Sequence, residues 1–371
     1  MQNKDVYFIL SSACRLVKGL KRSVIIDYDR GDLYFISHDY MELIQKMDRQ
    51  LVSSIQSEIE VGSADYFDEF LDFINTSETG FFTSSLENFP KISEEPAADD
   101  FVILMDVIIE VDKAFYKKSD FQSLCYQLSE IKCKDFQIRL LSKFDLTLLQ
   151  ELVDFITATH ANHIEIHGTY NADYDNNLLK QFVEENTLIG NIFIYSAPEV
   201  NIIDVINEQE IFQSISLGKV YFIDYPFDEG NCCGVIHQEN LNYSSPQLHN
   251  LLRTRNGCLD RKLTIDRYGN FKNCPSMKIQ YGNLRDIDIK TVIEKENFRK
   301  YWFISKDQIS TCKVCEFRYN CTDCRAFLQH PEDLYSKPLK CGYDPSTCKW
   351  EDWSENVLKE KEMKNKVLSK L

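Results

Sequence analysis

Apolar residues in the first 92 positions follow a strand pattern first and a helix pattern afterwards. Their alternation predicts three strands, at residues 6–10, 23–28 and 32–36. The turn between the last two, Asp29-Arg30-Gly31, has the residue types of a tight hairpin. Apolar residues at the spacing of a helix face then predict three helices, at residues 40–47, 52–59 and 67–74, before a Gly80-Phe81-Phe82 segment. This order of elements is that of a small winged-helix-like domain.

Beyond residue 92 the pattern changes to an alternation of strands and helices. An acidic, proline-containing stretch at 93–100 is interpreted as a linker. Strands are predicted at residues 101–111, 136–141, 163–167, 191–195 and 219–223. Helical patterns fall between them, at residues 121–131, 148–156 and 178–183. Such alternation is typical of βαβ units around a parallel sheet, and five strands suit a partial barrel better than a closed one.

Composition restricts the class of protein. A chain of 371 residues is long enough for two or three domains, and a hydrophobic fraction of 43% is sufficient for packed cores. No run of about 18 apolar residues occurs, so we expect no membrane span, and the N-terminus is a poor secretory signal. We therefore expect a cytoplasmic protein. A net charge of −16 argues against nonspecific nucleic-acid binding and against docking on anionic lipid.

Eight of the 13 cysteines fall between Cys258 and Cys348. Fifteen residues separate Cys258 from Cys274, and after a gap the order is Cys312-x2-Cys315-x5-Cys321-x2-Cys324, then Cys341 and Cys348. Thiols at this density in a reducing compartment indicate metal binding. Zinc modules usually place about 12–20 residues between their two cysteine pairs, whereas only five residues separate Cys315 from Cys321. The spacing favours two neighbouring iron–sulfur clusters, and a pair of zinc sites is the alternative.

The cysteine-rich segment carries a family resemblance. Gly269 lies five residues before Cys274, in a turn at 266–270 that allows a hairpin to bring Cys258 and Cys274 together. This order resembles the SPASM domain, whose pattern is C-x9–15-G-x4-C, then C-x2-C-x5-C-x3-C, then a distal cysteine; the resemblance covers residues 258–350. SPASM domains are C-terminal extensions of radical S-adenosylmethionine peptide maturases. The resemblance implies two auxiliary [4Fe-4S] clusters.

Position by position, the resemblance implies two ligand sets. The first is Cys258, Cys274 and Cys324, and the second is Cys312, Cys315, Cys321 and Cys341. The first set is one ligand short, and the candidates for it are Cys232, Cys233 and Cys348, or an exchangeable ligand or peptide. The final pair, Cys321-x2-Cys324, is one residue shorter than in the family, so Cys324 departs from its family position.

The central region resembles a degenerate form of the radical-SAM partial barrel. In that family a C-x3-C-x2-C triad after the first barrel strand binds the catalytic cluster, and no such triad occurs in this chain. The corresponding residues, 112–118, contain no thiol. We therefore predict no use of S-adenosylmethionine and no radical-SAM chemistry. The sequence identifies no catalytic residue.

A barrel without the triad, joined to this cysteine-rich region, is similar to the SPASM-domain peptide maturases of grasp-with-spasm systems, which are encoded beside an ATP-grasp ligase. The N-terminal region resembles the precursor-peptide recognition element of ribosomally made peptide pathways. The resemblance implies that a leader peptide adds as a strand to the edge at 32–36 and packs on the helix at 67–74. The candidate peptide-binding side chains are Leu33, Phe35, Phe67, Phe70, Leu71 and Ile74.

The expected organisation is α/β with three domains, a connector and a C-terminal helix. The domains are a winged-helix-like recognition domain at 1–92, a degenerate partial β/α barrel at 101–225 and a SPASM iron–sulfur domain at 258–350. The connector is expected at 226–257 and the helix at 351–371. The expected function is that of an accessory maturase in ribosomal peptide natural-product (RiPP) maturation, which binds the precursor peptide and partners an ATP-grasp ligase. The alternatives are an iron–sulfur redox enzyme acting on a peptide and a zinc-stabilised scaffold.

The remaining chemistry-bearing residues of the central region receive structural interpretations. Glu110 and Asp112 are expected to be solvated charges rather than an acid–base pair. Cys125 and Cys133 are expected to be small buried residues. The histidines are expected to be ordinary surface or strand-end residues, at positions His160, His163 and His167.

Overall fold

The computed structural model describes residues 6–58, 64–92, 103–207, 215–227, 236–238, 241 and 243–351. Several predictions from the sequence therefore lie outside the described residues. They are the linker at 93–100, the start of the strand at 101–102, Cys232, Cys233, and the C-terminal helix beyond residue 351.

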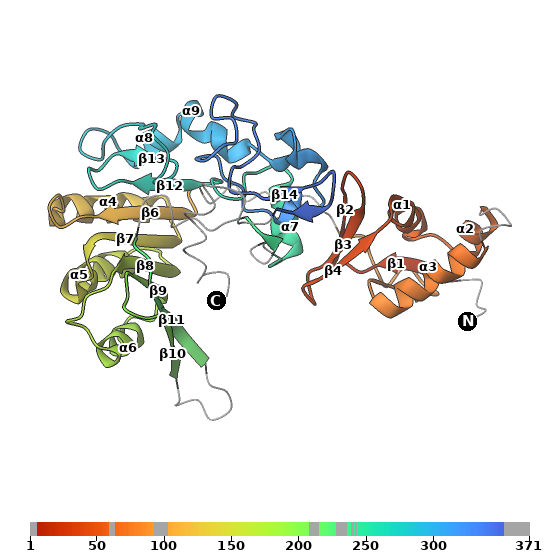
Figure 1. The fold of residues 1–371 in the computed structure, drawn as a ribbon, viewed down its shortest axis with the longest axis horizontal. Helices are drawn as coiled ribbons and strands as arrows, with labels where there is room; N and C mark the ends of the chain where they lie inside the picture. The colour runs from red at the N-terminus through yellow and green to blue at the C-terminus, as the bar shows by residue number, and fades with distance from the viewer. Residues whose placement is uncertain are drawn as a thin grey trace.

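The N-terminal region contains two small antiparallel sheets and three helices (Figure 1). One sheet pairs β1 (Tyr7–Leu10) with β5 (Gly80–Thr83), and the other has the order β2 (Cys14–Lys18), β3 (Ser23–Asp27), β4 (Asp32–Ile36). The helices are α1 (His38–Met47), α2 (Val52–Glu58) and α3 (Ala64–Ser77). The three predicted strands and three predicted helices are confirmed. Strand β2 is an additional element that the hydrophobic pattern did not predict.

Both faces of the β2–β3–β4 sheet are covered. One face, with Cys14 and Ile25, packs in a common core with the three helices. The opposite face, with Val17, Val24 and Ile26, packs against Tyr243 and Tyr319 from the C-terminal half of the chain. All five residues of β3 are consequently buried, whereas a hairpin strand with one solvated face would alternate. The N-terminal region therefore packs against the rest of the protein through this sheet.

The centre of the molecule is a mixed α/β unit with a large, mostly parallel sheet. Its five predicted strands are β6 (Asp106–Val111), β7 (Asp135–Lys143), β8 (His163–Thr169), β9 (Ile189–Tyr195) and β11 (Ile215–Ile223). Neighbouring members of this series are parallel. The strand predicted at 101–111 begins only at Asp106, because Met105 instead donates its backbone N–H to Arg261 O at 2.9 Å.

Three further strands extend this sheet at its edges. β10 (Asn201–Asn207) pairs antiparallel to β11 at one edge. At the other edge, β12 (Lys262–Ile265) runs parallel to β6 and forms a hairpin with β13 (Phe271–Lys272). The region predicted as a separate domain from residue 258 therefore contributes two strands to the central sheet.

Helices α4 (Lys118–Glu130), α5 (Leu146–Thr157) and α6 (Asn176–Glu185) cover one face of the central sheet (Figure 1). Their apolar sides and alternate strand residues such as Ile138 and Ile166 form the main hydrophobic core. Helices α8 (Ile289–Ile293) and α9 (Glu296–Arg299) add apolar residues to the same core. No helix in the described parts of the chain is long and apolar enough to cross a membrane.

The cysteine-rich segment lies between the central sheet and the N-terminal region (Figure 1). Apart from the β12–β13 hairpin, its regular structure is short. It consists of α8, α9, four single 3₁₀ turns between Lys300 and Asn320, and a hairpin of β14 (Tyr343–Asp344) and β15 (Lys349–Trp350). Helix α7 (Pro246–Leu252) precedes it, with Ser245 accepting a hydrogen bond from Leu248 N as the N-cap.

Candidate metal centre and edge strand

Four thiols of the second predicted ligand set lie near one another. Cys315, Cys321 and Cys341 belong to one apolar cluster, and Cys312 is buried beside it. Burial is the main cause that raises the pKa of Cys312 to about 11, where the Lys306 charge opposes it, and burial raises the pKa of Cys315 well above its ordinary value. The charges of Cys321 and Cys341 act in the same direction as burial on the pKa of both thiols. Four thiols this close repel one another when ionised, so a cation is required for all four to serve as thiolate ligands.

The donor chemistry of these four thiols fits an iron–sulfur cluster. Among the described residues, no group of three or more His, Cys, Asp or Glu side chains is arranged so that it could hold a metal ion as it stands. A zinc site requires its ligands on one ion, at about 2.3 Å for sulfur. In a four-iron cluster each thiolate binds a different iron, so the sulfurs lie farther apart. Cys312, Cys315, Cys321 and Cys341 are the residues that would hold such a cluster.

Two members of the first predicted set, Cys258 and Cys274, are brought together by the hairpin that the sequence predicted. Gly269 has a φ of +85°, and Asp266 Oδ1 accepts hydrogen bonds from Tyr268 N and Asn270 N, both at 2.9 Å, which closes the turn between β12 and β13. Cys258 and Cys274 then pack in one apolar cluster, together with Cys312. The third member of this set, Cys324, is also buried.

Cys348 lies on the other side of the segment. Its thiol interacts with the hydroxyl of Tyr343, a residue of the apolar cluster that contains Cys321. Cys348 adopts a φ of +56° in the turn between β14 and β15. The structure therefore places Cys348 nearer the second set than the first. The other cysteines proposed for the open position lie outside the described residues.

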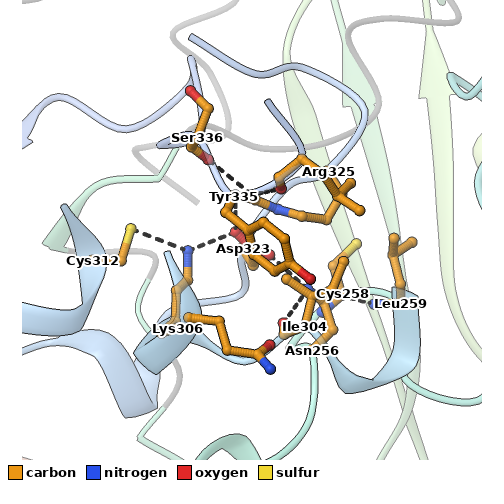
Figure 2. Close-up of polar contacts among 12 residues, drawn as sticks. Asn256, Cys258, Leu259, Ile304, Lys306, Cys312, Asp323, Arg325, Tyr335 and Ser336 are labelled. Atoms are coloured by element: carbon orange, nitrogen blue, oxygen red, sulfur yellow. Dashed lines mark hydrogen bonds and ion pairs between the residues drawn. The ribbon is translucent and has the colours of Figure 1, made fainter. Parts of the chain in front are cut away.

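A buried polar network connects the two thiol sets (Figure 2). Lys306 Nζ donates to Asp323 Oδ1 at 2.7 Å and lies 4.0 Å from Cys312 Sγ. Asn256 Nδ2 donates to Asp323 Oδ2 at 2.6 Å, while Asn256 Oδ1 accepts from Cys258 N at 3.0 Å. Asp323 and Asn256 thus link the backbone at Cys258 by hydrogen bonds to Lys306, which lies beside Cys312.

The network places one buried carboxylate between two cations. Burial acts to raise the pKa of Asp323, but Lys306 and Arg325 outweigh it and hold the pKa below its usual value. Arg325 donates to Asp323 Oδ1 at 2.7 Å and to the carbonyls of Leu334 and Ser336 at 2.9 and 2.8 Å. One carboxylate between two cations leaves a net positive charge beside the thiols. Such a charge favours thiolate ligands over neutral thiols.

Strand β4 is an edge of its sheet, because it pairs with β3 and with no other described strand. Beside it, four partly buried or exposed aromatic side chains form a continuous row. Ring centroids are 6.2 Å apart for Tyr34 and Phe73, 5.9 Å for Phe73 and Tyr40, and 5.0 Å for Tyr40 and Tyr66. We call Tyr34, Phe73, Tyr40 and Tyr66 the aromatic row.

The six peptide-binding side chains proposed from the sequence fall into two groups. Phe67, Phe70 and Ile74 point into the core of the N-terminal region and are buried there. Leu71 is partly buried, Phe35 is 40% exposed, and Leu33 packs against the cysteine-rich segment. These three residues lie on the buried face of α3, so they are not accessible to a peptide in this conformation. The aromatic row takes their place beside the edge strand.

The loop that follows β6 is held by ion pairs. Lys113 pairs with Asp145, Arg267 Nη1 lies 3.7 Å from Asp112 Oδ2, and Arg285 Nε lies 2.8 Å from Asp120 Oδ2. The cavity at this loop has a volume of about 50 Å³. No thiol lies in this loop, and its Asp112 and Lys113 pair with charged residues of neighbouring loops.

The sheet face opposite the helices carries a polar cluster that the sequence interpretation missed. Glu110 was expected to be solvated, which is wrong: it is buried and lies 3.2 Å from Arg139 Nη1, which is also fully buried. His167 was expected to be a surface or strand-end residue, and it too is buried, bonded to Glu165 at 2.7 Å and to the Tyr195 hydroxyl at 3.0 Å. These groups come from adjacent parallel strands, so their pairing depends on strand order.

No family model and no curated protein matches the chain. Among solved structures, it is similar to crystal structures of Streptococcus suis SuiB: the protein itself, with 10% identity and a TM-score of 0.30, and SuiB bound to S-adenosylmethionine, with 10% and 0.26. SuiB bound to its precursor peptide SuiA gives 9% and 0.28. Each alignment covers 86% of this chain and 96% of SuiB. TM-scores of this size do not establish a shared fold, so no role is transferred from SuiB to residues here.

Proposed function

We propose that this protein binds a ribosomally made precursor peptide as an accessory maturase and acts beside an ATP-grasp ligase, with a cysteine-bound iron–sulfur region that is mainly structural. The observation that carries the proposal is an edge strand, β4, next to the aromatic row. An extended peptide gains main-chain hydrogen bonds from such an edge and side-chain specificity from adjacent apolar surface. The resemblance of the cysteine spacing to SPASM maturases points to the same pathway.

The two faces of β4 lie against two different parts of the protein, α3 and the cysteine-rich segment. Tyr34 faces α3, with its ring against Phe73. Its neighbour Phe35 points to the other face and packs edge-on against Phe317 of the cysteine-rich segment, with ring centroids 5.9 Å apart. Because side chains alternate along a strand, a peptide paired to β4 would present alternate residues to the aromatic row and to the cysteine-rich segment.

Binding of a labelled candidate precursor peptide to the purified protein tests this proposal. Phe73→Ala removes a central member of the aromatic row, and loss of an aromatic anchor is expected to weaken binding by about 2 kcal/mol, roughly 30-fold. Tyr126→Ala is the matched control, since Tyr126 is 67% exposed on α4 of the central unit. Equal affinities for the two variants would contradict peptide binding at this edge.

The backbone contribution has its own test. Peptides N-methylated at alternate residues lose the donors that pair with a strand edge, so one register of methylation is expected to abolish binding and the other to spare it. Co-purification with an ATP-grasp ligase encoded nearby tests the partner. We also propose that the chain performs no radical-SAM chemistry, because 112–118 contains no thiol. Formation of 5′-deoxyadenosine from S-adenosylmethionine by the purified chain would overturn that part.

A further inference from the structure

The five residues between Cys315 and Cys321 all contact the N-terminal region. Glu316 Oε1 accepts from Arg22 Nε at 2.7 Å, and the Phe317 ring packs against Phe35. Arg318 Nη1 donates to Lys18 O at 2.7 Å, Tyr319 packs with the cluster of Val17, Val24 and Ile26, and Asn320 Nδ2 donates to the Tyr28 hydroxyl at 2.8 Å. We call residues 316–320 the docking segment.

The contact is close, and most of its side chains are buried. Glu316, Phe317 and Asn320 are each no more than 2% exposed. Gly19, in the turn between β2 and β3, has no room for a side chain: a Cβ there would lie 3.0 Å from Glu316 Oε2 and 2.6 Å from Arg22 O. The turn is therefore fitted against the docking segment, and a shift of that segment by an ångström would disturb the whole contact.

The docking segment has little regular structure of its own. It contains one 3₁₀ turn, Arg318–Asn320, and the preceding turn, Cys312–Val314, ends at Cys315. Isolated 3₁₀ turns are weak elements with poor hydrogen-bond geometry. Three kinds of contact fix the segment. The first is the N-terminal sheet, and the second is with other residues of the C-terminal half, such as Asp307 beside Arg318 and Trp350 beside Phe317. The third is the pair of thiols at its ends, Cys315 and Cys321, which belong to the same candidate ligand set.

We infer that metal loading of the second thiol set and docking of the peptide-recognition region are coupled through residues 316–320, which act as positioning residues. The inference rests on the proposed metal centre. A metal bound to Cys315 and Cys321 fixes both ends of the docking segment in the conformation that the β2–β3 turn fits. By linkage the coupling is reciprocal, so the docked region must also slow the loss of metal.

Amide hydrogen exchange of the full-length, anaerobically purified protein measures the first direction. Removal of metal with a chelator is expected to accelerate exchange at residues 18–22. Exchange in the interior of α3 is expected to stay the same, because its core lies within the N-terminal region. Unchanged exchange at residues 18–22 after metal removal would overturn the coupling.

The reverse direction is measured by metal release to a chromogenic chelator that takes iron or zinc. Arg22→Gln removes the charge that pairs with Glu316 at 2.7 Å. Lys18→Gln is the matched control, because the Lys18 side chain pairs with Glu42 at the surface while its carbonyl, which Arg318 uses, is retained. Release from Arg22→Gln is expected to be at least about fivefold faster than from the parent protein, and release from Lys18→Gln to equal it.

The outcomes separate the coupling from the metal centre. Equal release rates in metal-loaded Arg22→Gln and parent protein would overturn the coupling alone. An anaerobic preparation with neither iron nor zinc would overturn the metal centre and the coupling with it, and would leave peptide binding at β4 to its own assay. If metal removal accelerates exchange throughout the chain, the release rates of the two variants decide the question.

Discussion

The contact between the N-terminal region and the remainder of the protein should weaken in mild acid because of one buried histidine. His249, on α7, is only 4% exposed, and its Nδ1 lies 2.8 Å from the Tyr28 hydroxyl. The ring of Tyr319 packs against its other side, with centroids 5.0 Å apart. Burial, together with the charges of Arg15, Arg253 and Arg318, lowers the pKa of His249 from 6.5 to about 3.

The sign of the effect follows from proton linkage. The folded protein keeps the His249 ring neutral, whereas the unfolded chain binds a proton near pH 6.5, so protons favour the unfolded state. The stabilising contribution is complete above pH 6.5 and is lost as the pH falls from 6.5 towards 3. A depressed pKa of this size gives a slope of about 1.4 kcal/mol per pH unit within that window. Between pH 7.5 and pH 5.5 the expected loss is about 1.4 kcal/mol, or tenfold in the equilibrium constant.

Urea unfolding followed by tryptophan fluorescence is a suitable assay, since Trp350 lies against Phe317 in the docking segment, with ring centroids 5.9 Å apart. Carboxylates and other histidines also titrate in this range, so the informative quantity is the difference from His249→Gln, which cannot take up the proton. The parent protein should lose about 1.4 kcal/mol more than this variant between pH 7.5 and 5.5. Identical losses would refute the reasoning, because His249 would then titrate alike in the folded and unfolded states.

Three further substitutions test other parts of the structure by urea unfolding. Gly19→Ala should cost about 1–3 kcal/mol, because the added Cβ would lie 2.6 Å from a backbone carbonyl of its own turn; a neutral effect would show that the turn relaxes easily. Lys306→Met should cost about 3 kcal/mol and lower the metal content, since it leaves the buried Asp323 carboxylate with fewer cationic partners; unchanged metal content would argue against a role beside Cys312. Arg139→Met should cost about 3–5 kcal/mol by removing the cation that faces buried Glu110, with wild-type peptide binding as the internal check that the N-terminal region is intact.

Sequence periodicity was most informative where contacts are local. The hairpin at Asp29-Arg30-Gly31, the helices of the N-terminal region and the first five parallel strands follow from patterns within about ten residues, and the structure confirms them. Strand β2 was missed because its five residues, Cys14–Lys18, include two cations, and its second apolar face exists only through contact with distant tyrosines. The pairing of β12 with β6 was missed for a similar reason: the hairpin of β12 and β13 was predicted, but β6 lies far away in the sequence.

The site shows the same division between local pattern and long-range contact. The ligand sets implied by the family resemblance stay a prediction, and three members of the second set, Cys315, Cys321 and Cys341, share one apolar cluster. The spacing could not assign Lys306 or Asp323, which are unremarkable in sequence and become significant only when both are buried between the thiol sets. The hydrophobic pattern also could not distinguish the buried face of α3 from its exposed face, because aromatic residues occur on both. Phe70 is buried, whereas Tyr66 is exposed.

The spacer between Cys315 and Cys321 shows how one short segment can satisfy two constraints. For ligand geometry, only the length of this spacer, five residues, matters. For the contact with the N-terminal region, its residue types matter: an acid pairs with Arg22, an aromatic ring packs on Phe35, and an amide donates to the Tyr28 hydroxyl. Ligand spacing alone gives no reason to bury charged and amide side chains against the N-terminal region, since burying a polar group costs free energy unless its partner is in place. Each of these side chains has such a partner there, so the residue identities of the loop serve that contact in addition to the metal binding that we propose for the flanking cysteines.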